Sequence, residues 1–365
     1  MEIIHIILGK ANPNRLNGVN KVVYNLASEQ HAAGKNVQVW GITKDEEHNY
    51  PSRSFKTELF AASANPFWID NALKNAIRAK PQAVYHLHGG WIPVFGSLAK
   101  FFSKNKIRYV LTPHGAYNEI AMRKSQFKKK LFFRLQENVL IENAHCVHLL
   151  GKSEAEGLES LVPQAKSVVI PYGFNVHEKS FLPPDNEKFV IGFMGRLDVH
   201  TKGLDLLLEA YASFSEAKEN VELWIVGDGE GKTFMESYIS KNGLRKVILW
   251  GKKLADEKDA LLARMHVFAH PSRNEGLPSG ILEAAAIGVT CVVSEATNLA
   301  EYIEKHKAGI AIANDSVEEL QRAFENLYQI FAEGKLKEYK NGAIEMIEKS
   351  FSWKTLVEKY DELYV

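Results

Sequence analysis

Glu275 and Glu283 are the residues whose type and spacing most clearly indicate chemistry. They lie eight positions apart in the run PSRNEGLPSGILE at 271–283. The run follows an apolar segment and opens a helical pattern, so its backbone amides would be unpaired and point outward. A carboxylate can accept hydrogen bonds from sugar hydroxyls while such amides hold phosphate. The pattern therefore predicts a site for a phosphorylated sugar at Glu275, Gly276, Leu277, Pro278 and Glu283, with an ordinary turn and helix as the alternative.

Two cations bracket a second predicted helix start. Arg196 follows the apolar run 189–193, and Lys202 precedes a helical pattern over 203–215. An arginine offers a fork of donors and a lysine a point charge, and a diphosphate can use both. Exposed surface charge is the alternative. The nearby run GDGEG at 227–231 is a weak dinucleotide signal, and we interpret it as a tight turn after a strand.

Gly18 and His114 are the corresponding candidates in the first half. Gly18 opens the helical pattern 19–33, and a glycine there permits close approach of the backbone to a ligand. His114 directly follows a strand pattern that ends at Thr112. An imidazole at the carboxyl end of a strand can hydrogen-bond a reacting sugar, although a capped loop histidine is the alternative.

Further histidines and the cysteines are interpreted as structural. His86 and His88 alternate along one predicted strand, and His148 lies on another, with no second ligand pair at a zinc spacing. We therefore expect no metal site. Cys146 and Cys291 both lie within apolar runs, which favours buried thiols in a reducing compartment.

The elements that must position these residues form two series of strands alternating with helices. Continuous apolar strands in such alternation predict parallel sheets covered on both faces, with ligands bound beyond the carboxyl ends of the strands. The sequence therefore predicts an α/β fold of two doubly wound domains. The strands are expected at 3–8, 37–42, 83–87, 108–112, 146–150 and 167–170, then at 189–193, 222–226, 247–250, 267–270, 290–294 and 309–312, with further helices at 278–287 and 317–332.

The domain organisation follows from a proline-rich polar stretch at 171–187. The chain has 365 residues, 45% of them hydrophobic, which is enough for two cores. We predict domains at 1–175 and 176–350 and a terminal amphipathic helix at 351–365 with Ser352 as its N-cap. The apolar N-terminus is interpreted as a strand rather than a signal peptide. No apolar run has the roughly 20 residues needed to span a bilayer, so the expected location is cytoplasmic, with peripheral docking on the inner face of the membrane as the alternative.

Charge is distributed unevenly although its total is only +1, which argues against nucleic acid as a partner. Residues 1–175 hold 22 Lys and Arg against 13 Asp and Glu, whereas residues 176–365 hold 23 against 31. The stretch 122–134 carries six of the positive charges, interleaved with aromatic residues. We expect it to bind an anionic membrane or a diphosphate-linked acceptor, with a solvated helix face as the alternative. The residues concerned are Arg123, Lys124, Lys128, Lys129 and Lys130.

Taken together, these motifs resemble the retaining nucleotide-sugar glycosyltransferases of the GT-B fold (family-four type, glycosyltransferase group 1). The resemblance implies two Rossmann-like domains that face a central cleft, with the terminal helix crossing back to the first. The first domain would bind the acceptor and the second the donor. The matching residues are Gly18, Thr112–Gly115, Gly195-Arg196, Lys202-Gly203, Glu275 and Glu283.

The resemblance also implies roles for single residues. Arg196 and Lys202 would hold the donor diphosphate, Glu275 the sugar hydroxyls and Glu283 the ribose. His114 would lie beside the sugar, so that His114 and Glu275 are the expected catalytic pair. Gly18 would let the first helix approach the donor. The sequence has Asn-Gly here where Gly-Gly is commoner, which implies a small shift in geometry on the acceptor side.

The implied reaction transfers a hexose with retention from a nucleotide sugar to a saccharide acceptor. UDP is favoured as the carrier and GDP second, and the acceptor is expected to be linked to a polyprenyl diphosphate, as in surface polysaccharide synthesis. The sequence offers no convincing nucleophile, so we favour attack by the acceptor on the face that the nucleotide leaves. The chain has no D-x-D motif, which fits a reaction that requires neither metal nor cofactor.

Two other functions remain open from the sequence. A nucleotide-sugar epimerase can share the two-domain architecture, but it would need an acid–base pair that is not evident here. A non-catalytic nucleotide-sugar-binding scaffold at a membrane is the second. A dehydrogenase is disfavoured because the first strand is followed by ANPN at 11–14 rather than by a G-x-G-x-x-G fingerprint.

Overall fold

The computed structural model describes residues 1–13, 18–118, 130–174, 187–253 and 255–365. They form two compact units, which we call unit 1 (Met1–Gly173 with Trp353–Val365) and unit 2 (Phe174–Ser352). Both boundaries lie two residues from the predicted ones. The assignment of the acceptor to the first domain and of the donor to the second stays a prediction.

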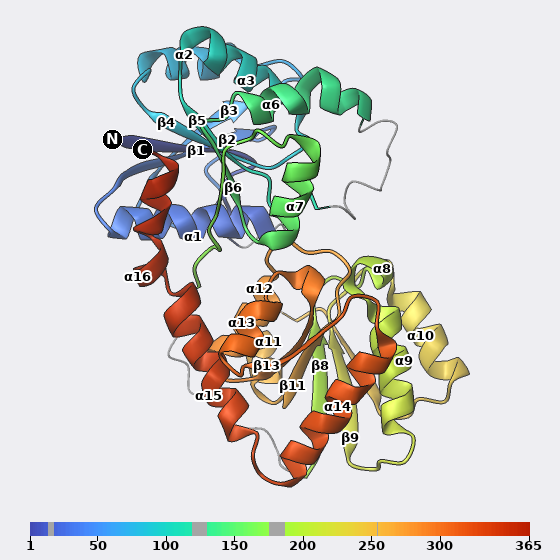
Figure 1. The fold of residues 1–365 in the computed structure, drawn as a ribbon. Coiled ribbons are helices and arrows are strands. Elements are labelled where there is room, and N and C mark those ends of the chain that lie inside the picture. The colour runs from blue at the N-terminus through green and yellow to red at the C-terminus, as the bar shows by residue number, and fades with distance from the viewer. Residues whose placement is uncertain (14–17, 119–129, 175–186, 254) are drawn as a thin grey trace. The chain divides into compact units, whose positions relative to one another are not determined.

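Unit 1 is built on a seven-stranded parallel sheet in the order β3-β2-β1-β4-β5-β6-β7. Helix α1 lies on one face, and α2 and α3 lie on the other (Figure 1). The strands are β1 (Glu2–Leu8), β2 (Asn36–Thr43), β3 (Lys56–Ala61), β4 (Val84–His88), β5 (Tyr109–Thr112), β6 (Cys146–Leu149) and β7 (Ser167–Val169). The helices are α1 (Gly18–Ala32), α2 (Asn71–Ala79), α3 (Pro93–Asn105), the π-helix η1 (Phe133–Glu137), α6 (Asn138–Glu142) and α7 (Lys152–Leu161).

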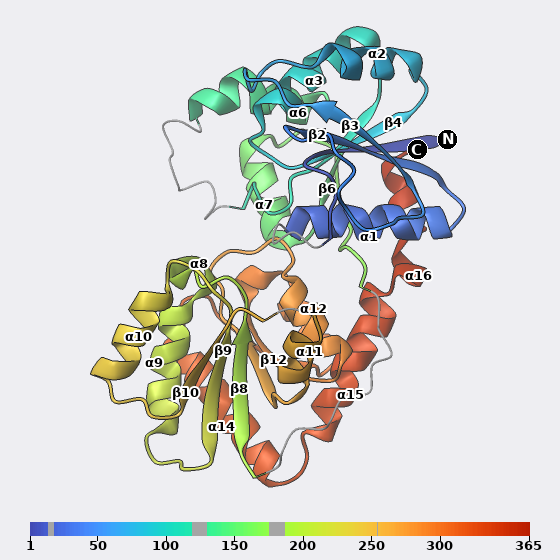
Figure 2. The same cartoon turned by 180° about the vertical axis from the view of Figure 1, so that it is seen from behind.

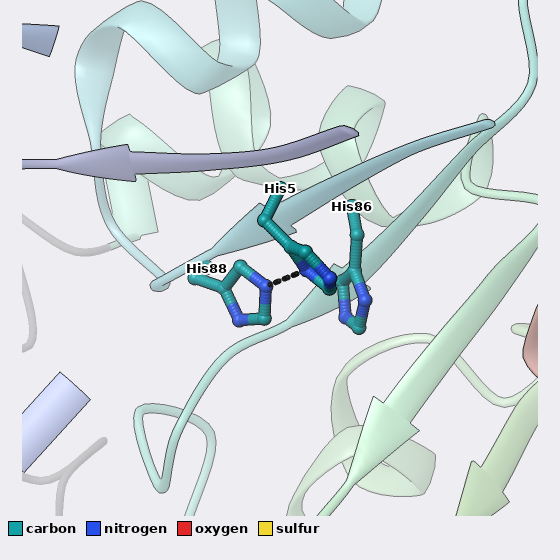
Figure 3. A group of neighbouring side chains, drawn as sticks. All are labelled: His5, His86 and His88. Carbon is teal, nitrogen blue, oxygen red and sulfur yellow. Dashed lines mark hydrogen bonds between the residues drawn. The ribbon is translucent and has the colours of Figure 1, made fainter. Parts of the chain in front are cut away.

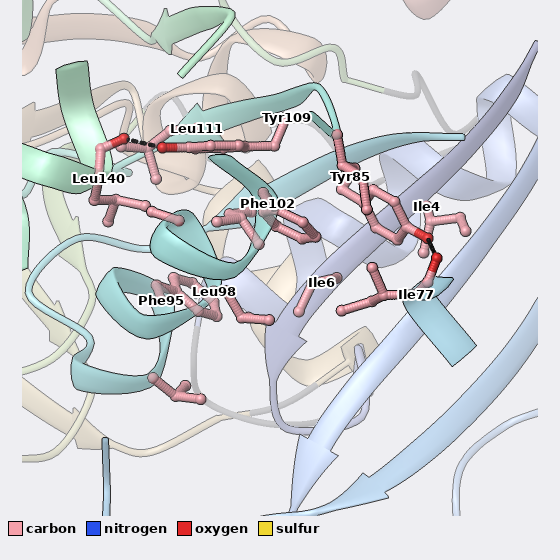
Figure 4. Packing of buried hydrophobic residues seen from close by; sticks show 14 of the residues in the cluster. Ile4, Ile6, Ile77, Tyr85, Phe95, Leu98, Phe102, Tyr109, Leu111 and Leu140 are labelled. Atoms are coloured by element: carbon pink, nitrogen blue, oxygen red, sulfur yellow. Dashed lines mark hydrogen bonds between the residues drawn. The ribbon is translucent and has the colours of Figure 1, made fainter. Parts of the chain in front are cut away.

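The two faces of this sheet differ in chemistry because successive side chains of a strand point to opposite sides. Ile4 and Tyr85 lie on the α2 and α3 side, in an apolar core with Phe102 (Figure 4). The intervening positions His5 and His86 point to the other side and are paired in register between β1 and β4. Both histidines are fully buried, so this face encloses polar groups that must find hydrogen-bond partners within the protein.

Unit 2 has a six-stranded parallel sheet in the order β10-β9-β8-β11-β12-β13. Helices α9, α10 and α14 cover one face, and α11, α12 and α13 cover the other (Figures 1 and 2). Two all-parallel sheets with helices on both faces confirm the predicted fold class. The strands are β8 (Phe189–Met194), β9 (Val221–Val226), β10 (Val247–Gly251), β11 (Val267–His270), β12 (Thr290–Ser294) and β13 (Gly309–Ile312). The helices are α8 (Val199–Lys202), α9 (Leu204–Ser215), α10 (Lys232–Lys241), α11 (Ala255–Ala263), α12 (Ser279–Ala286), α13 (Ala300–Lys305), α14 (Val317–Ala332) and α15 (Lys337–Met346), with the 3-10 turn η2 (Glu295–Thr297) and the π-helix η3 (Ile347–Phe351).

The terminal segment returns to unit 1, as predicted, but it is not one helix. It consists of α16 (Trp353–Leu356) and the 3-10 turn η4 (Lys359–Leu363). The indole of Trp353 occupies the space beside Gly173, where an added Cβ would lie 2.3 Å from the ring. Tyr360 and Tyr364 are buried as well. Burial of these aromatic side chains against unit 1 determines the path of the segment and interrupts the regular helix.

Candidate functional site

The side chains of Lys202 and Glu275 meet at the carboxyl ends of β8 and β11 in unit 2. The Lys202 ammonium donates a hydrogen bond to Oε1 of Glu275. The same oxygen accepts from Nε2 of His270 at 3.0 Å and from Oγ of Ser272 at 3.0 Å. The two charged side chains are only 16% and 13% exposed, so the pair is largely withdrawn from water.

Glu275 is held as an anion. Burial alone would raise its pKa, but the hydrogen bond from His270 and the Lys202 charge outweigh burial and lower the pKa to about 2. Burial also lowers the pKa of His270, which favours a neutral imidazole that donates through Nε2. The carboxylate therefore stays ionised at physiological pH and can accept hydrogen bonds from hydroxyl groups.

Gly203 and Arg273 bring together the segment that follows β8 and the loop that follows β11. Gly203 has φ of +63°, and a Cβ there would lie 2.1 Å from the carbonyl oxygen of Pro271. Arg273 donates to both carboxylate oxygens of Asp205 at 2.8 and 2.9 Å and to the carbonyl of His200 at 2.9 Å. This clamp fixes the end of α8 against the loop after β11. Nothing in the local sequence around Arg273 signals this role.

Arg196 follows β8 and is more open to solvent than Lys202. Its side chain is 71% exposed and contacts Asp198 at 3.3 Å. The loop beneath it packs against glycines, since a Cβ at Gly227 would lie 1.8 Å from the carbonyl oxygen of Gly195. The GDGEG run is thus a tight turn that supports the backbone next to Arg196. Lys202 precedes the Gly203 break between α8 and α9 rather than a continuous helix start.

Helix α12 carries Glu283, which accepts a hydrogen bond from Lys258 at 2.7 Å. The helix begins at Ser279, and Pro278 is its N-cap, so the expectation that Pro278 is the first helical residue is wrong by one position. Asn298 donates through Nδ2 to the carbonyl of Gly276 at 2.7 Å. The predicted donor residues Gly276, Leu277, Pro278 and Glu283 therefore lie on one loop and helix that begin beside Glu275.

His114 lies in unit 1, immediately after β5, with a left-handed φ of 56°. Glu154 shapes this loop by accepting from the backbone amides of Gly115 at 2.5 Å and Leu150 at 3.2 Å. Burial lowers the pKa of His114 to about 3, so its ring is neutral. Its Nε2 lies 3.1 Å from Nδ1 of His88.

Gly18 and the basic stretch complete the predicted residues. Gly18 is the first residue of α1, and a Cβ there would meet nothing within 4 Å. Arg123, Lys124, Lys128 and Lys129 lie outside the described residues, whereas Lys130 is described and exposed.

Apolar side chains are exposed next to Lys130. Leu131 and Leu135 are 64% and 58% exposed, and Trp68 is 59% exposed. Phe67 and Phe132 bring the two segments together, with ring centroids 6.3 Å apart. The sequence does not signal the contribution of residues 67–68 to this surface, because they are distant from the basic stretch along the chain. Among the described residues, no helix is both long enough and apolar enough to cross a bilayer.

His5, His86 and His88 form the one group of potential metal ligands found within the described part of the chain (Figure 3). One nitrogen from each lies within 4.8 Å of the others. All six ring nitrogens, however, already have hydrogen-bond partners. A metal ion could bind here only by breaking those bonds, so the geometry favours a hydrogen-bonded cluster. Cys146 and Cys291 are both free and buried.

Comparison with protein families finds two matches that together cover most of the chain. Residues 16–178 match the family described as glycosyltransferase family 4. Residues 176–345 match the family described as glycosyl transferases group 1. The junction between the two matches falls at the boundary of the two structural units.

Individual relatives are distant. An uncharacterized glycosyltransferase of Methanocaldococcus jannaschii is 25% identical over 278 residues, which cover 72% of this chain and 69% of that protein. A phosphatidylinositol N-acetylglucosaminyltransferase component of Arabidopsis thaliana is 25% identical over 260 residues, covering 70% of this chain and 56% of the plant protein. The HepE protein of Anabaena, solved in complex with UDP, aligns with a TM-score of 0.76 at 16% identity and covers 100% of this chain and 99% of its own. That likeness shows a shared fold.

Proposed function

Since the chain belongs to the group 1 glycosyltransferases of the GT-B fold, we propose that it transfers a hexose from a UDP-sugar to a saccharide acceptor with retention at the anomeric carbon. The observation that carries this proposal is the buried contact between Lys202 and Glu275. It joins a cation suited to phosphate and an anion suited to sugar hydroxyls at one point of unit 2. The complex of the fold relative HepE with UDP supports UDP as the carrier, with GDP second.

The donor would be held by unit 2. Lys202 and the exposed Arg196 bind the diphosphate, and the amides at the start of α12 add further donors. Glu275 accepts hydrogen bonds from the sugar hydroxyls, and Glu283 from the ribose. Lys202 and Lys258 neutralise these carboxylates, so the site would bind a donor without burying an unpaired charge.

The reaction is a displacement at the anomeric carbon. The bond from that carbon to the nucleotide phosphate breaks, and the diphosphate leaves with the electron pair. The acceptor hydroxyl oxygen attacks from the same face, and its proton passes to an oxygen of the leaving phosphate. Lys202 and Arg196 stabilise the charge that develops on the diphosphate. Glu275 is a poor nucleophile, because its pKa is lowered to about 2 and three donors converge on one of its oxygens.

His114 acts on the sugar as a neutral hydrogen-bonding group. Its half-buried ring belongs to a loop that Glu154 holds through the backbone amide of Gly115. A neutral imidazole avoids placing a second positive charge next to an anomeric carbon that becomes electron-poor. We propose that the positive charges of Lys202 and Arg196 supply the stabilisation that a metal ion provides in other transferases, so that no metal is needed.

The acceptor would be lipid-linked and reached at an anionic membrane surface. Exposed Leu131 and Leu135 lie on the same helical segment as Lys130, and exposed Trp68 follows Phe67, whose ring neighbours that of Phe132. Such a mixture of apolar and basic groups suits the edge of a bilayer. Each Lys or Arg near an anionic surface contributes about 1 kcal/mol. By its name, the plant relative acts on phosphatidylinositol, which also supports a lipid-borne acceptor in glycan synthesis.

The test is a calorimetric screen of UDP-, GDP- and ADP-sugars, followed by transfer assays with the donor that binds best. We expect a UDP-sugar to bind and to give an α-linked product from an α-linked donor in the presence of EDTA. Formation of an isomeric donor without acceptor would instead identify an epimerase. Loss of activity in EDTA that manganese restores would contradict the metal-independent mechanism.

A further inference from the structure

A chain of hydrogen bonds leads from His114 into the polar side of the unit 1 sheet. Nε2 of His114 lies 3.1 Å from Nδ1 of His88. Nε2 of His88 lies 2.9 Å from Nδ1 of His5 (Figure 3). Nε2 of His5 lies 2.7 Å from the side-chain oxygen of Gln30 on α1. The three imidazoles thus form a line that starts at the candidate catalytic residue.

The chain of hydrogen bonds continues through Tyr364 of the terminal segment. The amide nitrogen of Gln30 donates to Oη of Tyr364 at 3.1 Å. Oη of Tyr364 lies 3.0 Å from Nδ1 of His86, and Nε2 of His86 lies 2.6 Å from Oγ1 of Thr112. These four residues, Gln30, Tyr364, His86 and Thr112, are at most 1% exposed. Tyr364 therefore joins two branches: the three histidines that reach it through Gln30 on α1, and His86 on β4, which bonds it directly.

The far end of the chain fixes the direction of every bond. Oγ1 of Thr112 lies 2.8 Å from Nδ1 of His148, whose Nε2 lies 2.7 Å from the carbonyl oxygen of Ile170. A carbonyl can only accept, so the proton of His148 lies on Nε2. A neutral imidazole has one donor and one acceptor, so Nδ1 of His148 accepts from the Thr112 hydroxyl. The Thr112 oxygen then accepts from Nε2 of His86.

The same reasoning assigns the donor and acceptor of each bond between His86 and His114. Nδ1 of His86 accepts from the Tyr364 hydroxyl, and the Tyr364 oxygen accepts from the Gln30 amide. The Gln30 carbonyl then accepts from Nε2 of His5. Nδ1 of His5 accepts from His88, and Nδ1 of His88 accepts from His114. Burial lowers the pKa of all five histidines on this path, which keeps each ring neutral as the chain requires.

We propose that Tyr364 is a positioning residue that acts through Gln30, His5 and His88 to hold His114 with its proton on Nε2 and its lone pair on Nδ1. The Tyr364 hydroxyl sets which end of the Gln30 amide faces His5. Without it, the amide can turn over, and the three-histidine branch can reverse so that His114 carries its proton on Nδ1. The consequence for catalysis rests on the proposed role of His114, because only the first form can accept a hydrogen bond from a sugar hydroxyl through Nδ1.

The experiment is nitrogen-15 NMR of the full chain labelled at histidine, with the His114 signals assigned by their loss in His114→Asn. We expect the wild-type protein to carry the His114 proton on Nε2. We expect Tyr364→Phe to show both tautomers, with kcat reduced about tenfold and KM for the donor little changed, since one hydrogen bond in the transition state is lost. Tyr360→Phe is the matched control: it removes a buried hydroxyl from the same segment that bonds Pro171 instead, and it should change neither readout.

A second pair of variants, at Gln30, tests the same hydrogen-bond path if Tyr364→Phe unfolds the protein. Gln30→Met removes the acceptor for His5 and should allow the same mixture of tautomers. Gln30→Glu keeps an acceptor at that position and should preserve the wild-type tautomer. A wild-type His114 protonated on Nδ1, or tautomer and kcat unchanged in both Tyr364→Phe and Gln30→Met, would overturn the inference. The tautomer of His114 can be measured even where no sugar transfer is detected. An absence of transferase activity would therefore contradict the proposed function without contradicting the hydrogen-bond path from Tyr364 to His114.

Discussion

Lys202 and Glu275 form an ion pair within unit 2 although they lie 73 positions apart in the sequence. The contact exists because Gly203 lets the chain pass against Pro271 and because Arg273 clamps the two loops through Asp205. Two loops held together by Gly203 and Arg273 thus fix the two functional groups in one geometry. Such preorganisation is what electrostatic stabilisation of a leaving group requires.

Glu275→Gln should abolish most activity while leaving the fold and nucleotide binding in place. The amide retains hydrogen-bonding atoms but removes the charge that holds sugar hydroxyls, and one charge-assisted hydrogen bond accounts for about 1.5–3 kcal/mol. We expect kcat to fall about 100-fold, measured by transfer assays with saturating donor. Glu283→Gln is the control: it should weaken binding of nucleoside diphosphate with a smaller change in kcat. Equal kcat in wild type and Glu275→Gln would remove Glu275 from the reaction.

Gly203→Ala and Gly18→Ala should differ sharply in stability. At Gly203 the backbone has φ of +63° and a Cβ would collide with a carbonyl oxygen at 2.1 Å, so we expect a loss of roughly 2 kcal/mol or more. At Gly18 the space is open, so alanine should leave the unfolding free energy nearly unchanged. Denaturant unfolding measures both. Reduced donor affinity in a fully stable Gly18→Ala protein would indicate a ligand in that open space.

Stability of unit 1 should fall as pH decreases below 6.5. His5 has a pKa lowered from 6.5 to about 4 by burial, so the unfolded chain binds a proton that the folded chain does not. The stabilisation is complete above 6.5 and is lost as pH falls toward 4, and the His5 shift alone corresponds to about 3 kcal/mol. Thermal unfolding between pH 4 and 7 measures this, and His5→Gln should give a shallower pH dependence. A flat profile in the wild type would contradict it.

Two buried glutamates of unit 1 should have the opposite effect on stability: their contribution should fall as pH rises. Burial raises the pKa of Glu137 and Glu154 to about 7, so their folded forms favour the proton. Their contribution is complete below the ordinary value of 4.5 and is lost as pH rises through 7. Glu137→Gln cannot ionise and should lose less stability than the wild type between pH 5 and 8. An identical pH dependence in the variant would show that Glu137 is already ionised at pH 5.

The exposed apolar and basic surface should bind anionic vesicles. Trp68→Ser combined with Leu131→Ser should reduce co-sedimentation with phosphatidylserine-containing liposomes, and Lys128, Lys129 and Lys130 changed to Glu should abolish it. Binding should weaken with added salt because its electrostatic part is screened. Arg322→Glu, at an exposed position of α14 in unit 2, is the control and should leave binding intact. Absence of binding at low salt would exclude a membrane role.

The strands of both sheets were predictable because most are continuous apolar runs buried on two faces. Strand β3 was missed: Lys56, Thr57 and Glu58 interrupt the apolar pattern, and within β3 only Phe60 is buried. It is an edge strand, where solvent allows polar residues that a central strand excludes. The terminal helix was predicted as continuous because its apolar spacing is helical, but packing of its aromatic residues against unit 1 overrides that local preference.

Candidate site residues were predictable where they follow strands, as Lys202, Glu275 and His114 do. Their partners were not, because contacts such as Arg273 with Asp205 depend on how distant loops pack. The alternation of His86 and His88 was visible in the sequence, but their connection to Gln30 and Tyr364 requires the strand register and the return of the terminal segment. Long-range hydrogen bonds between residues of ordinary type leave no local signal.

Calorimetric titration of the best-binding UDP-sugar, followed by UDP alone, tests the central claim most directly when wild type is compared with Lys202→Met. Lys232→Met, which removes an exposed lysine of the same unit, is the control. The account predicts that Lys202→Met weakens binding of both ligands at least tenfold, since a charge-assisted bond to phosphate is lost, while Lys232→Met binds as the wild type does. Wild-type affinity for both ligands in a folded Lys202→Met protein would contradict a donor site at Lys202 and Glu275.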